Sequence, residues 1–313
     1  MSALLLGFFD FGISLGFGIW SLGFPPGAAR FGIWSLGFPS ENRLVEIPDA
    51  LGIIAGNGVY PRLLADAARR AGVKQIVAAA FSDETDDRLA GKVDEIHWMR
   101  VGQLGKLIAC FRAAGVTDAI MAGQIAPKNL FDLRPDWKTL LLLARLKRRN
   151  AESIFAAIGD ELARAKITLR PATSFLEDCL APAGLIAGRK LTRREEEDVA
   201  LGFEIAREIS RLDIGQTVIV KNGTVLAVEG FDGTNETIKR GGALGGRNAI
   251  MVKVAKPNQD MRFDVPVIGV ETIGIAVAAH LRVIAVEPGR TLLLEKEALL
   301  GLAARSNISI VAR

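Results

Sequence analysis

Short apolar runs alternate with stretches of helical periodicity along most of the chain. Leu51–Ala55 is an apolar run of strand length, and a helical pattern follows that Pro61 begins and Gly72 ends. Proline is favoured in the first helical turn and glycine just past the last one. Residues 74–80 are predicted to be a second strand. The pattern therefore predicts a strand–helix–strand unit, as in α/β proteins.

Glycine-rich turns follow two of the predicted strands, at 51–55 and at 118–122. The turn residues are Gly56, Asn57, Gly58, Gly123 and Gln124. Ligands of open α/β sheets bind at the carboxyl ends of strands, and backbone N–H groups beside a helix N-terminus attract anions. Simple turn chemistry is the alternative. A dinucleotide fingerprint is disfavoured, because Pro61 stands where its third glycine would be.

The pattern changes near residues 180–188, a stretch rich in Gly, Ala and Pro, and we place the linker between domains nearby. Beyond it, Thr192 and Glu195 form a capping box that begins a long helix. Asn222-Gly223 between two apolar runs predicts a β-hairpin. A later helix is predicted to end at Gly241-Gly242, and the run at 265–270 is predicted to be a strand. The predicted domains are therefore 49–180 and 181–313.

Residues 1–48 do not follow this pattern. The sequence FGIWSLGFP occurs twice, at 17–25 and at 31–39. Glycines and the Pro25-Pro26 pair interrupt any membrane helix, and no Lys or Arg precedes the apolar part as in a signal peptide. We interpret this segment as a disordered or non-native extension, with a weak interfacial anchor through Phe and Trp as the alternative.

Composition limits the classes of function. The net charge of +4 suits an anionic substrate or an anionic membrane surface and is too small to indicate nucleic acid. Cys110 and Cys179 predict reduced thiols in a cytosolic protein. Only His97 and His280 are present, so a dinuclear phosphoesterase with several histidine ligands cannot be assembled. Any metal should have oxygen ligands, and Mg²⁺ is the first choice.

Residues 136–149 predict a helix that ends in a basic cluster. The cluster consists of Arg145, Lys147, Arg148 and Arg149. Such a cluster is typical of a solvated helix C-terminus, where it interacts favourably with the helix dipole. Contact with anionic lipid headgroups is the alternative.

The strongest candidate chemistry lies at residues 253–264, ahead of the run at 265–270. It combines Lys253, Lys256, Gln259 and Asp264. Lysine supplies positive charge for phosphate oxygens, and aspartate supplies a ligand for Mg²⁺ or a base for water. A solvated loop before a core strand is the alternative. Carboxylates and glycines also gather at 213–216 and 229–235, and such groups in one concavity can hold Mg²⁺ on a diphosphate.

Seven segments carry a resemblance to a known family. They are LGIIAGNGVYPRLLA (51–65), VGQLGKL (101–107), AGQ (122–124), REISRLDIGQ (207–216), AVEGFDGTN (227–235), KVAKPNQDMRFDVPVIGVETI (253–273) and EPGRTLLL (287–294). Together they resemble the UDP-2,3-diacylglucosamine pyrophosphatases of lipid A biosynthesis of the LpxI type, which are unrelated to the calcineurin-like enzymes. The resemblance runs from about Val45 to the C-terminus.

The resemblance implies an α/β fold with a Rossmann-like N-terminal domain, a C-terminal α/β catalytic domain and a site in the cleft between them. It implies Mg²⁺-dependent hydrolysis of the diphosphate to UMP and 2,3-diacylglucosamine 1-phosphate (lipid X), with water attacking the sugar-side phosphorus. The family's catalytic aspartate falls on Asp264. The chain departs from the family at Asn235, where an aspartate is usual, near residues 149–152, where a GDD-like run is changed, and at residues 1–48, which have no counterpart.

These observations combine into one site hypothesis. Asp264 and Glu229 are predicted metal ligands, and Asp264 is the predicted catalytic residue. The predicted substrate-binding residues are Gly56, Asn57, Gly58, Gly123, Gln124, Asp213, Gln216, Gly233, Thr234, Lys253, Lys256 and Gln259. The rival interpretations are a non-catalytic protein that binds nucleotide sugars or lipids and an NAD(P)-dependent oxidoreductase.

The expected partner is an amphipathic nucleotide-sugar lipid, without nucleic acid. The expected location is the cytoplasm, with transient peripheral contact at the inner membrane surface as a further expectation. A homo-oligomer is left open.

Overall fold

The computed structural model describes residues 47–125, 135–146, 151–256 and 260–313. The predicted extension at 1–48 lies almost wholly outside these ranges, as do Gln259 and the end of the basic cluster. Among the residues that the structure describes, no helix has the length and apolar character needed to cross a bilayer.

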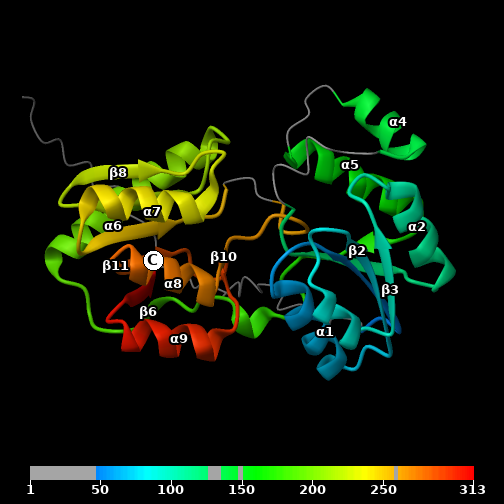
Figure 1. The fold of residues 1–313 in the computed structure, drawn as a ribbon, viewed down its shortest axis with the longest axis horizontal. Helices are drawn as coiled ribbons and strands as arrows, with labels where there is room; N and C mark the ends of the chain where they lie inside the picture. Colours follow the sequence, from blue (N-terminus) through cyan, green and yellow to red (C-terminus); the bar gives the residue numbers. More distant parts are fainter. Residues whose placement is uncertain (1–46, 126–134, 147–150, 257–259) are drawn as a thin grey trace, which may run out of the picture. The chain divides into compact units, whose positions relative to one another are not determined.

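The first half of the chain forms a five-stranded parallel sheet with the order β3-β2-β1-β4-β5 (Figure 1). The strands are β1 (Ala50–Ala55), β2 (Gln75–Phe81), β3 (Glu95–Met99), β4 (Asp118–Ala122) and β5 (Thr168–Leu169). This strand order is that of a doubly wound fold. The chain adds strands on one side of β1 as far as β3 and then crosses to the other side with β4, so the order of addition reverses between β1 and β4. The predicted Rossmann-like architecture is therefore confirmed.

Helices cover both faces of this sheet. They are α1 (Tyr60–Ala71), α2 (Leu104–Ala113), α4 (Trp137–Arg145) and α5 (Ala151–Arg164), with the 3₁₀ turns η1 (Asp87–Gly91) and η2 (Glu177–Cys179). Side chains of a strand alternate between its faces. Ile53 accordingly packs with Leu64 of α1, whereas Ile54 belongs to the cluster that contains Phe111 of α2 and Leu162 of α5. Both faces are therefore buried, as a parallel sheet requires.

The second half forms a six-stranded mixed sheet with the order β6-β13-β11-β9-β7-β8. The strands are β6 (Gly184–Ala187), β7 (Thr217–Lys221), β8 (Thr224–Val228), β9 (Ala249–Lys253), β11 (Leu281–Val286) and β13 (Ser309–Ala312). Strands β9, β11 and β13 run parallel, and β7 runs antiparallel to both β8 and β9. The hairpin predicted at Asn222-Gly223 is confirmed, with positive φ at both residues.

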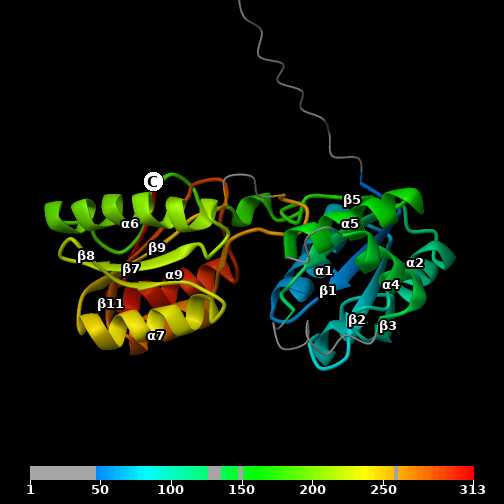
Figure 2. The same cartoon turned by 90° about the horizontal axis from the view of Figure 1, so that it is seen from above.

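Helix α6 (Arg193–Arg211) covers one face of this sheet, and α7 (Gly233–Gly245), α8 (Val270–Ala278) and α9 (Lys296–Arg305) belong to the core on the other (Figure 2). The capping box is confirmed, because the Thr192 hydroxyl accepts from Glu195 N and the Glu195 carboxylate accepts from Thr192 N. A short parallel pair, β10 (Val267–Ile268) and β12 (Leu292–Leu293), completes the fold.

Strand β6 occupies part of the stretch at 180–188, near which we place the linker, and it pairs antiparallel with β13. Two element predictions were wrong. The run at 265–270 is a strand only at Val267–Ile268, because Val270 already begins α8. Helix α7 continues through Gly241 and Gly242 to Gly245. A Cβ atom on Gly241 would lie 2.5 Å from the Ile219 side chain of β7, and one on Gly242 would lie 2.6 Å from Ala279 at the end of α8, so these glycines let α7 pack closely against the sheet and α8.

Candidate functional site

One edge of the C-terminal sheet collects most of the predicted polar residues. Strands β8, β9 and β11 end at this edge, and β7 begins there because it runs antiparallel to its neighbours. Thr217, the first residue of β7, is therefore paired with Lys253, the last residue of β9. Glu229 directly follows β8. Topology thus places three sequence-distant polar residues side by side.

Hydrogen bonds join these residues into what we call the Lys253 network, which comprises Lys253, Thr234, Glu229, Gln216 and Thr217. Lys253 Nζ donates to Thr234 Oγ1 over 2.9 Å, and Thr234 Oγ1 donates to Glu229 Oε1 over 2.9 Å. The other carboxylate oxygen, Oε2, accepts from Gln216 N at 3.1 Å. The Thr217 hydroxyl lies 3.4 Å from that of Thr234. A buried lysine is thus connected to a buried carboxylate through a threonine.

Burial decides the electrostatics of Lys253. Lys253 is only 4% exposed, and Glu229 is 7% exposed. Burial lowers the pKa of the Lys253 ammonium group, and the carboxylates of Glu229 and Asp264 offset only part of this effect. A cation held in this way keeps little hydration of its own.

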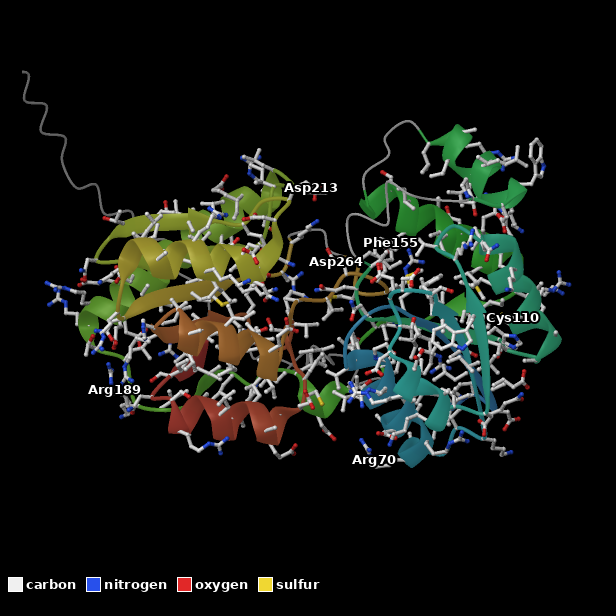
Figure 3. All side chains as sticks on the ribbon, viewed as in Figure 1. Arg70, Cys110, Phe155, Arg189, Asp213 and Asp264 are labelled. Carbon is white, nitrogen blue, oxygen red and sulfur yellow. The ribbon has the colours of Figure 1, made fainter. Side chains whose placement is uncertain are left out.

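Asp264 lies at the open side of this arrangement. Lys256 Nζ is 2.7 Å from Asp213 Oδ1 and 3.8 Å from Asp264 Oδ2. The Asp264 side chain is 38% exposed, in contrast to the buried Glu229. Figure 3 labels Asp213 and Asp264, which come from segments far apart in the sequence. Asp264 is therefore partly accessible to a ligand and lies close to Lys256, and its charge also favours the cationic form of Lys253.

Two glycines shape the backbone of the site. A Cβ atom on Gly215 would lie 2.3 Å from the Glu229 carbonyl oxygen, so glycine is required for the approach that brings Gln216 to Glu229. Gly233 has a φ of 80°, in the left-handed region, and begins α7. The first turn of α7 then carries Thr234 into the Lys253 network. The predicted residue Gly233 therefore acts through backbone geometry.

The donor set fits Mg²⁺ in part. Among the described residues, no group of three or more His, Cys, Asp or Glu side chains is arranged to hold a metal ion. Mg²⁺ needs only one or two carboxylates when substrate phosphates and water complete its coordination. Asp264 and Glu229 supply such carboxylates, and Gln216 Oε1 is a buried oxygen without a hydrogen-bond partner among the described residues. Glu229 already accepts one hydrogen bond on each oxygen.

Asn235, the departure from the family pattern, has a definite partner. Its Nδ2 donates to Glu271 Oε1 over 3.0 Å and so links the first turns of α7 and α8. An aspartate at this position would place a second carboxylate against Glu271. The exchange of Asp for Asn is therefore compatible with the local charge of this chain.

The two glycine turns of the N-terminal sheet follow β1 and β4, the neighbouring strands between which the order of strand addition reverses, and they contact each other. Asn57 N donates to the Gln124 carbonyl over 2.6 Å, and Gln124 N donates to the Asn57 carbonyl over 3.3 Å. A Cβ atom on Gly56 or on Gly123 would lie 2.5 Å from the facing backbone. The N–H groups of Asn57 and Gln124 are thus engaged with each other, which explains the glycines by close packing. A role of these turns in substrate binding stays a prediction, as does a site in a cleft between the domains.

Sequence reasoning missed the residues that support the 253–256 segment. Glu287 Oε2 accepts from Ala255 N at 2.9 Å, and Arg290 Nη2 donates to the Lys256 carbonyl over 3.2 Å. Arg207 in turn lies 3.4 Å from the other oxygen of Glu287. Arg207 lies in the segment REISRLDIGQ, and Glu287 and Arg290 lie in EPGRTLLL, but neither segment indicates these contacts.

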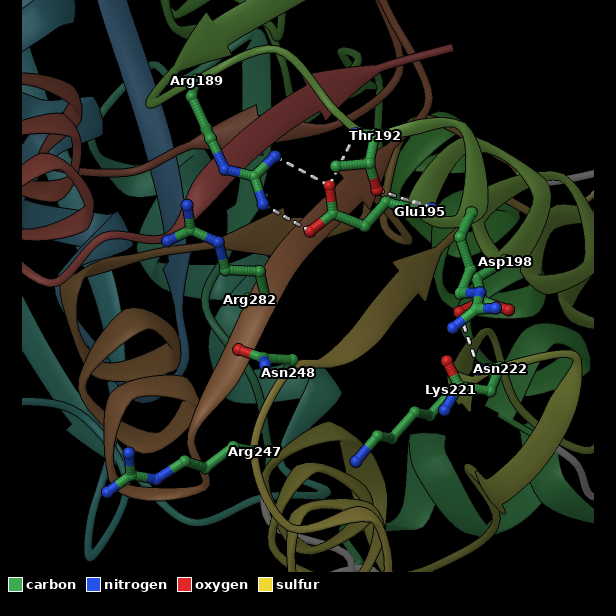
Figure 4. A pocket seen from close by; sticks show the side chains of 10 residues that line it. Arg189, Thr192, Glu195, Asp198, Lys221, Asn222, Arg247, Asn248 and Arg282 are labelled. Atoms are coloured by element: carbon green, nitrogen blue, oxygen red, sulfur yellow. Dashed lines mark hydrogen bonds and ion pairs between the residues drawn. The ribbon is translucent and has the colours of Figure 1, made fainter.

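A separate pocket of about 510 Å³ lies at the opposite edge of the C-terminal sheet, where β7 ends and β9 and β11 begin (Figure 4). It is lined by Arg189, Thr192, Arg194, Glu195, Asp198, Lys221, Asn222, Arg247, Asn248 and Arg282. No predicted site residue is among them. Its carboxylates have structural partners: Glu195 is paired with Arg189, and Asp198 accepts from the backbone of the hairpin turn. This pocket is therefore distinct from the candidate site.

Comparison with known proteins decides the family. The family model described as LpxI N-terminal domain matches residues 50–179, and the one described as LpxI C-terminal domain matches residues 182–311. The chain belongs to the LpxI family. A curated LpxI relative, the UDP-2,3-diacylglucosamine pyrophosphatase LpxI of Caulobacter vibrioides, is 31% identical over 266 residues, which cover 81% of this chain and 93% of the relative. The family resemblance predicted from the motifs is confirmed.

Two of the solved structures that this chain resembles are biotin carboxylases, and both likenesses are distant. The biotin carboxylase subunit of pyruvate carboxylase matches 55% of this chain with a TM-score of 0.25 and 14% identity. The biotin carboxylase domain of the Hydrogenobacter thermophilus 2-oxoglutarate carboxylase matches 56% with a TM-score of 0.24 and 12% identity. The chain spans about a third of the length of each. Neither likeness carries an argument about function.

Proposed function

We propose that this LpxI protein hydrolyses the diphosphate of UDP-2,3-diacylglucosamine, the substrate in the name of its curated relative. Membership of the family makes the chain an enzyme of the pyrophosphatase class, as the motifs predicted. The observation that carries the proposal within the structure is the grouping of the Asp264 carboxylate with two lysines. Lys256 Nζ lies 3.8 Å from this carboxylate, and the charge of Asp264 favours the cationic form of the buried Lys253. This group provides charge for a diphosphate and a carboxylate that can orient water.

The proposed reaction follows from attack at the sugar-side phosphorus. Water adds to that phosphorus, the bond between the phosphorus and the bridging oxygen breaks, and UMP leaves. The products are UMP and 2,3-diacylglucosamine 1-phosphate, and the oxygen from water ends in the latter. Lys253 and Lys256 neutralise phosphate oxygens, which lowers the repulsion that an approaching nucleophile meets.

Asp264 is the proposed catalytic residue. Its exposed carboxylate holds the attacking water by hydrogen bonding or serves as a metal ligand. Glu229 and Gln216 are the proposed additional oxygen donors. When bound there, Mg²⁺ would supply positive charge to the diphosphate oxygens. Thr234 and Thr217 position Lys253 and Glu229 rather than touch the reacting atoms.

The substitution Asp264→Asn tests these assignments. The variant keeps the shape of the side chain and loses its charge, so we expect turnover to fall by at least about 100-fold, the range of general acid–base contributions. The KM for the substrate should change far less. Steady-state kinetics on detergent-dispersed UDP-2,3-diacylglucosamine gives both values. The matched control is Glu236→Gln, which removes an exposed carboxylate from the first turn of α7.

Turnover of Asp264→Asn within a few-fold of the parent protein would rule out Asp264 as the catalytic residue. Absence of cleavage by the parent protein, together with tight binding of the intact substrate, would instead support the alternative of a non-catalytic binding protein. Omission of Mg²⁺ in the same assay tests the metal separately.

A further inference from the structure

Helix α4 presents an apolar stripe to solvent. Trp137, Leu140, Leu141 and Ala144 follow the spacing of one helix face, and we call them the outer face of α4. Trp137 is 74% exposed, Leu140 is 45% exposed and Leu141 is 41% exposed. The apolar stripe of a surface helix normally faces a core. Here an apolar stripe points away from the protein and lacks a partner among the described residues.

The opposite side of the helix fixes this orientation. Asp136 caps α4 by accepting from Thr139 N at 2.8 Å and also accepts from Gly105 N of α2 at 2.6 Å. The Thr139 hydroxyl donates to the Gly102 carbonyl over 2.6 Å. Leu142 is buried in the core that α2 shares. Rotation of α4 to hide its outer face would break these hydrogen bonds and expose Leu142.

Cationic groups border the outer face. Lys138 and Arg145 are one position further along the helix than Trp137 and Ala144, so they lie on one flank of the stripe. Lys138 is paired with Glu161 of α5 at 3.3 Å, whereas the guanidinium of Arg145 has no partner among the described residues. A hollow of about 390 Å³ beside the helix is lined by Trp137, Lys138, Leu141, Leu142, Arg145 and Glu161. The surface is thus apolar with a charged border.

This combination matches a membrane surface better than a second protein. Tryptophan favours the boundary between headgroups and acyl chains, leucine favours the acyl region, and Lys or Arg favours anionic phosphates. A stable protein interface buries about 800 Å² on each partner, more than four side chains of one short helix provide. We infer that the outer face of α4 docks on a bilayer that contains anionic phospholipid.

The inference rests on the proposed function in one respect. A substrate with two acyl chains resides in a membrane, so its enzyme has to reach that surface. Docking through α4 would hold the protein where this substrate is concentrated. The binding itself requires no substrate, and so it can be measured separately from catalysis.

Co-sedimentation with vesicles tests the inference on the full-length chain. Vesicles of phosphatidylcholine with phosphatidylglycerol are compared with vesicles of phosphatidylcholine alone. The double variant Trp137→Ala/Leu141→Ser should lower the partition coefficient on the anionic vesicles by about ten-fold or more, because it removes two apolar contacts. Arg145→Glu should weaken binding to the anionic vesicles only, and added salt should reduce this preference.

The matched control is Leu244→Ser, which replaces a leucine of α7 that is 70% exposed and should leave vesicle binding unchanged. All variants should keep the kcat of the parent protein on detergent-dispersed substrate. Residues 1–48 are present throughout, so binding through that segment would be equal in every variant.

Parent-like vesicle binding by the double variant would overturn the inference. A loss of turnover in detergent with unchanged vesicle binding would also overturn it, because α4 would then serve the substrate's acyl chains. A parent protein that is dimeric in solution and becomes monomeric with Trp137→Ala would assign this face to a second copy. If no form of the protein cleaves the substrate and vesicle binding still depends on α4, the proposed function fails and the docking surface stands.

Discussion

Lys253 brings a buried ammonium group to a sheet edge that also holds two carboxylates. Its desolvation opposes the charged form, and Glu229 and Asp264 favour it. Such an arrangement is costly for stability, because a buried charge pair rarely recovers the full cost of its dehydration. The site therefore has features that a function in phosphate chemistry explains better than folding does.

Substitution of Lys253 measures this balance. Lys253→Met leaves the Glu229 carboxylate buried without its cation, and we expect a loss of about 3 kcal/mol in the free energy of unfolding. The double variant Lys253→Met/Glu229→Gln removes both charges and should regain at least about half of that loss. Both variants should have lost turnover, because both lack the Lys253 cation. Urea unfolding and kinetic assays measure the two quantities.

The matched single variant Glu229→Gln completes a double-mutant cycle. A double variant no more stable than Lys253→Met would show that Lys253 and Glu229 do not interact as a pair. Normal turnover in the double variant would show that the lysine has no role in catalysis.

At the scale of elements, the sequence correctly predicted the helices, strands and turns that have strong local signals. The capping box at Thr192, the Asn222-Gly223 hairpin and the strand–helix–strand unit that starts at β1 all depend on residues close in sequence. Strand β6 was missed because it is a half-exposed edge strand that depends on pairing with β13. The glycines of α7 were interpreted as a helix end, since only the packed structure shows that Gly241 faces Ile219 of β7 and Gly242 faces Ala279 at the end of α8.

Two glycine-to-alanine variants test that account of α7. Glycine inside a helix normally costs about 1 kcal/mol relative to alanine. Gly274→Ala in α8 should therefore raise the free energy of unfolding by about that amount, because a Cβ there meets no atom within 4 Å. Gly242→Ala should lower the free energy of unfolding, since its Cβ would lie 2.6 Å from Ala279 O. Thermal and urea unfolding measure the sign of each change.

Stabilisation of similar size by both variants would contradict the close-packing explanation for α7. The pair is matched, because each glycine lies in a helix interior and neither has a positive φ.

At the scale of the whole molecule, the candidate site depends on contacts between distant segments. The sequence identified Lys253, Glu229 and Asp264 by residue type and by resemblance, but it did not predict that β7 pairs with β9 and so places Thr217 beside Lys253. The support of Ala255 by Glu287 likewise spans 32 positions. Local patterns cannot reveal such pairs, because they arise from sheet topology.

Product analysis in water enriched in ¹⁸O tests the central claim most directly. The full-length protein is incubated with UDP-2,3-diacylglucosamine and Mg²⁺, and mass spectrometry locates the heavy oxygen in the products. We predict labelled 2,3-diacylglucosamine 1-phosphate and unlabelled UMP, with neither product formed by Asp264→Asn at a comparable rate. Heavy oxygen in UMP, or no cleavage by a folded parent protein, would contradict the proposed reaction.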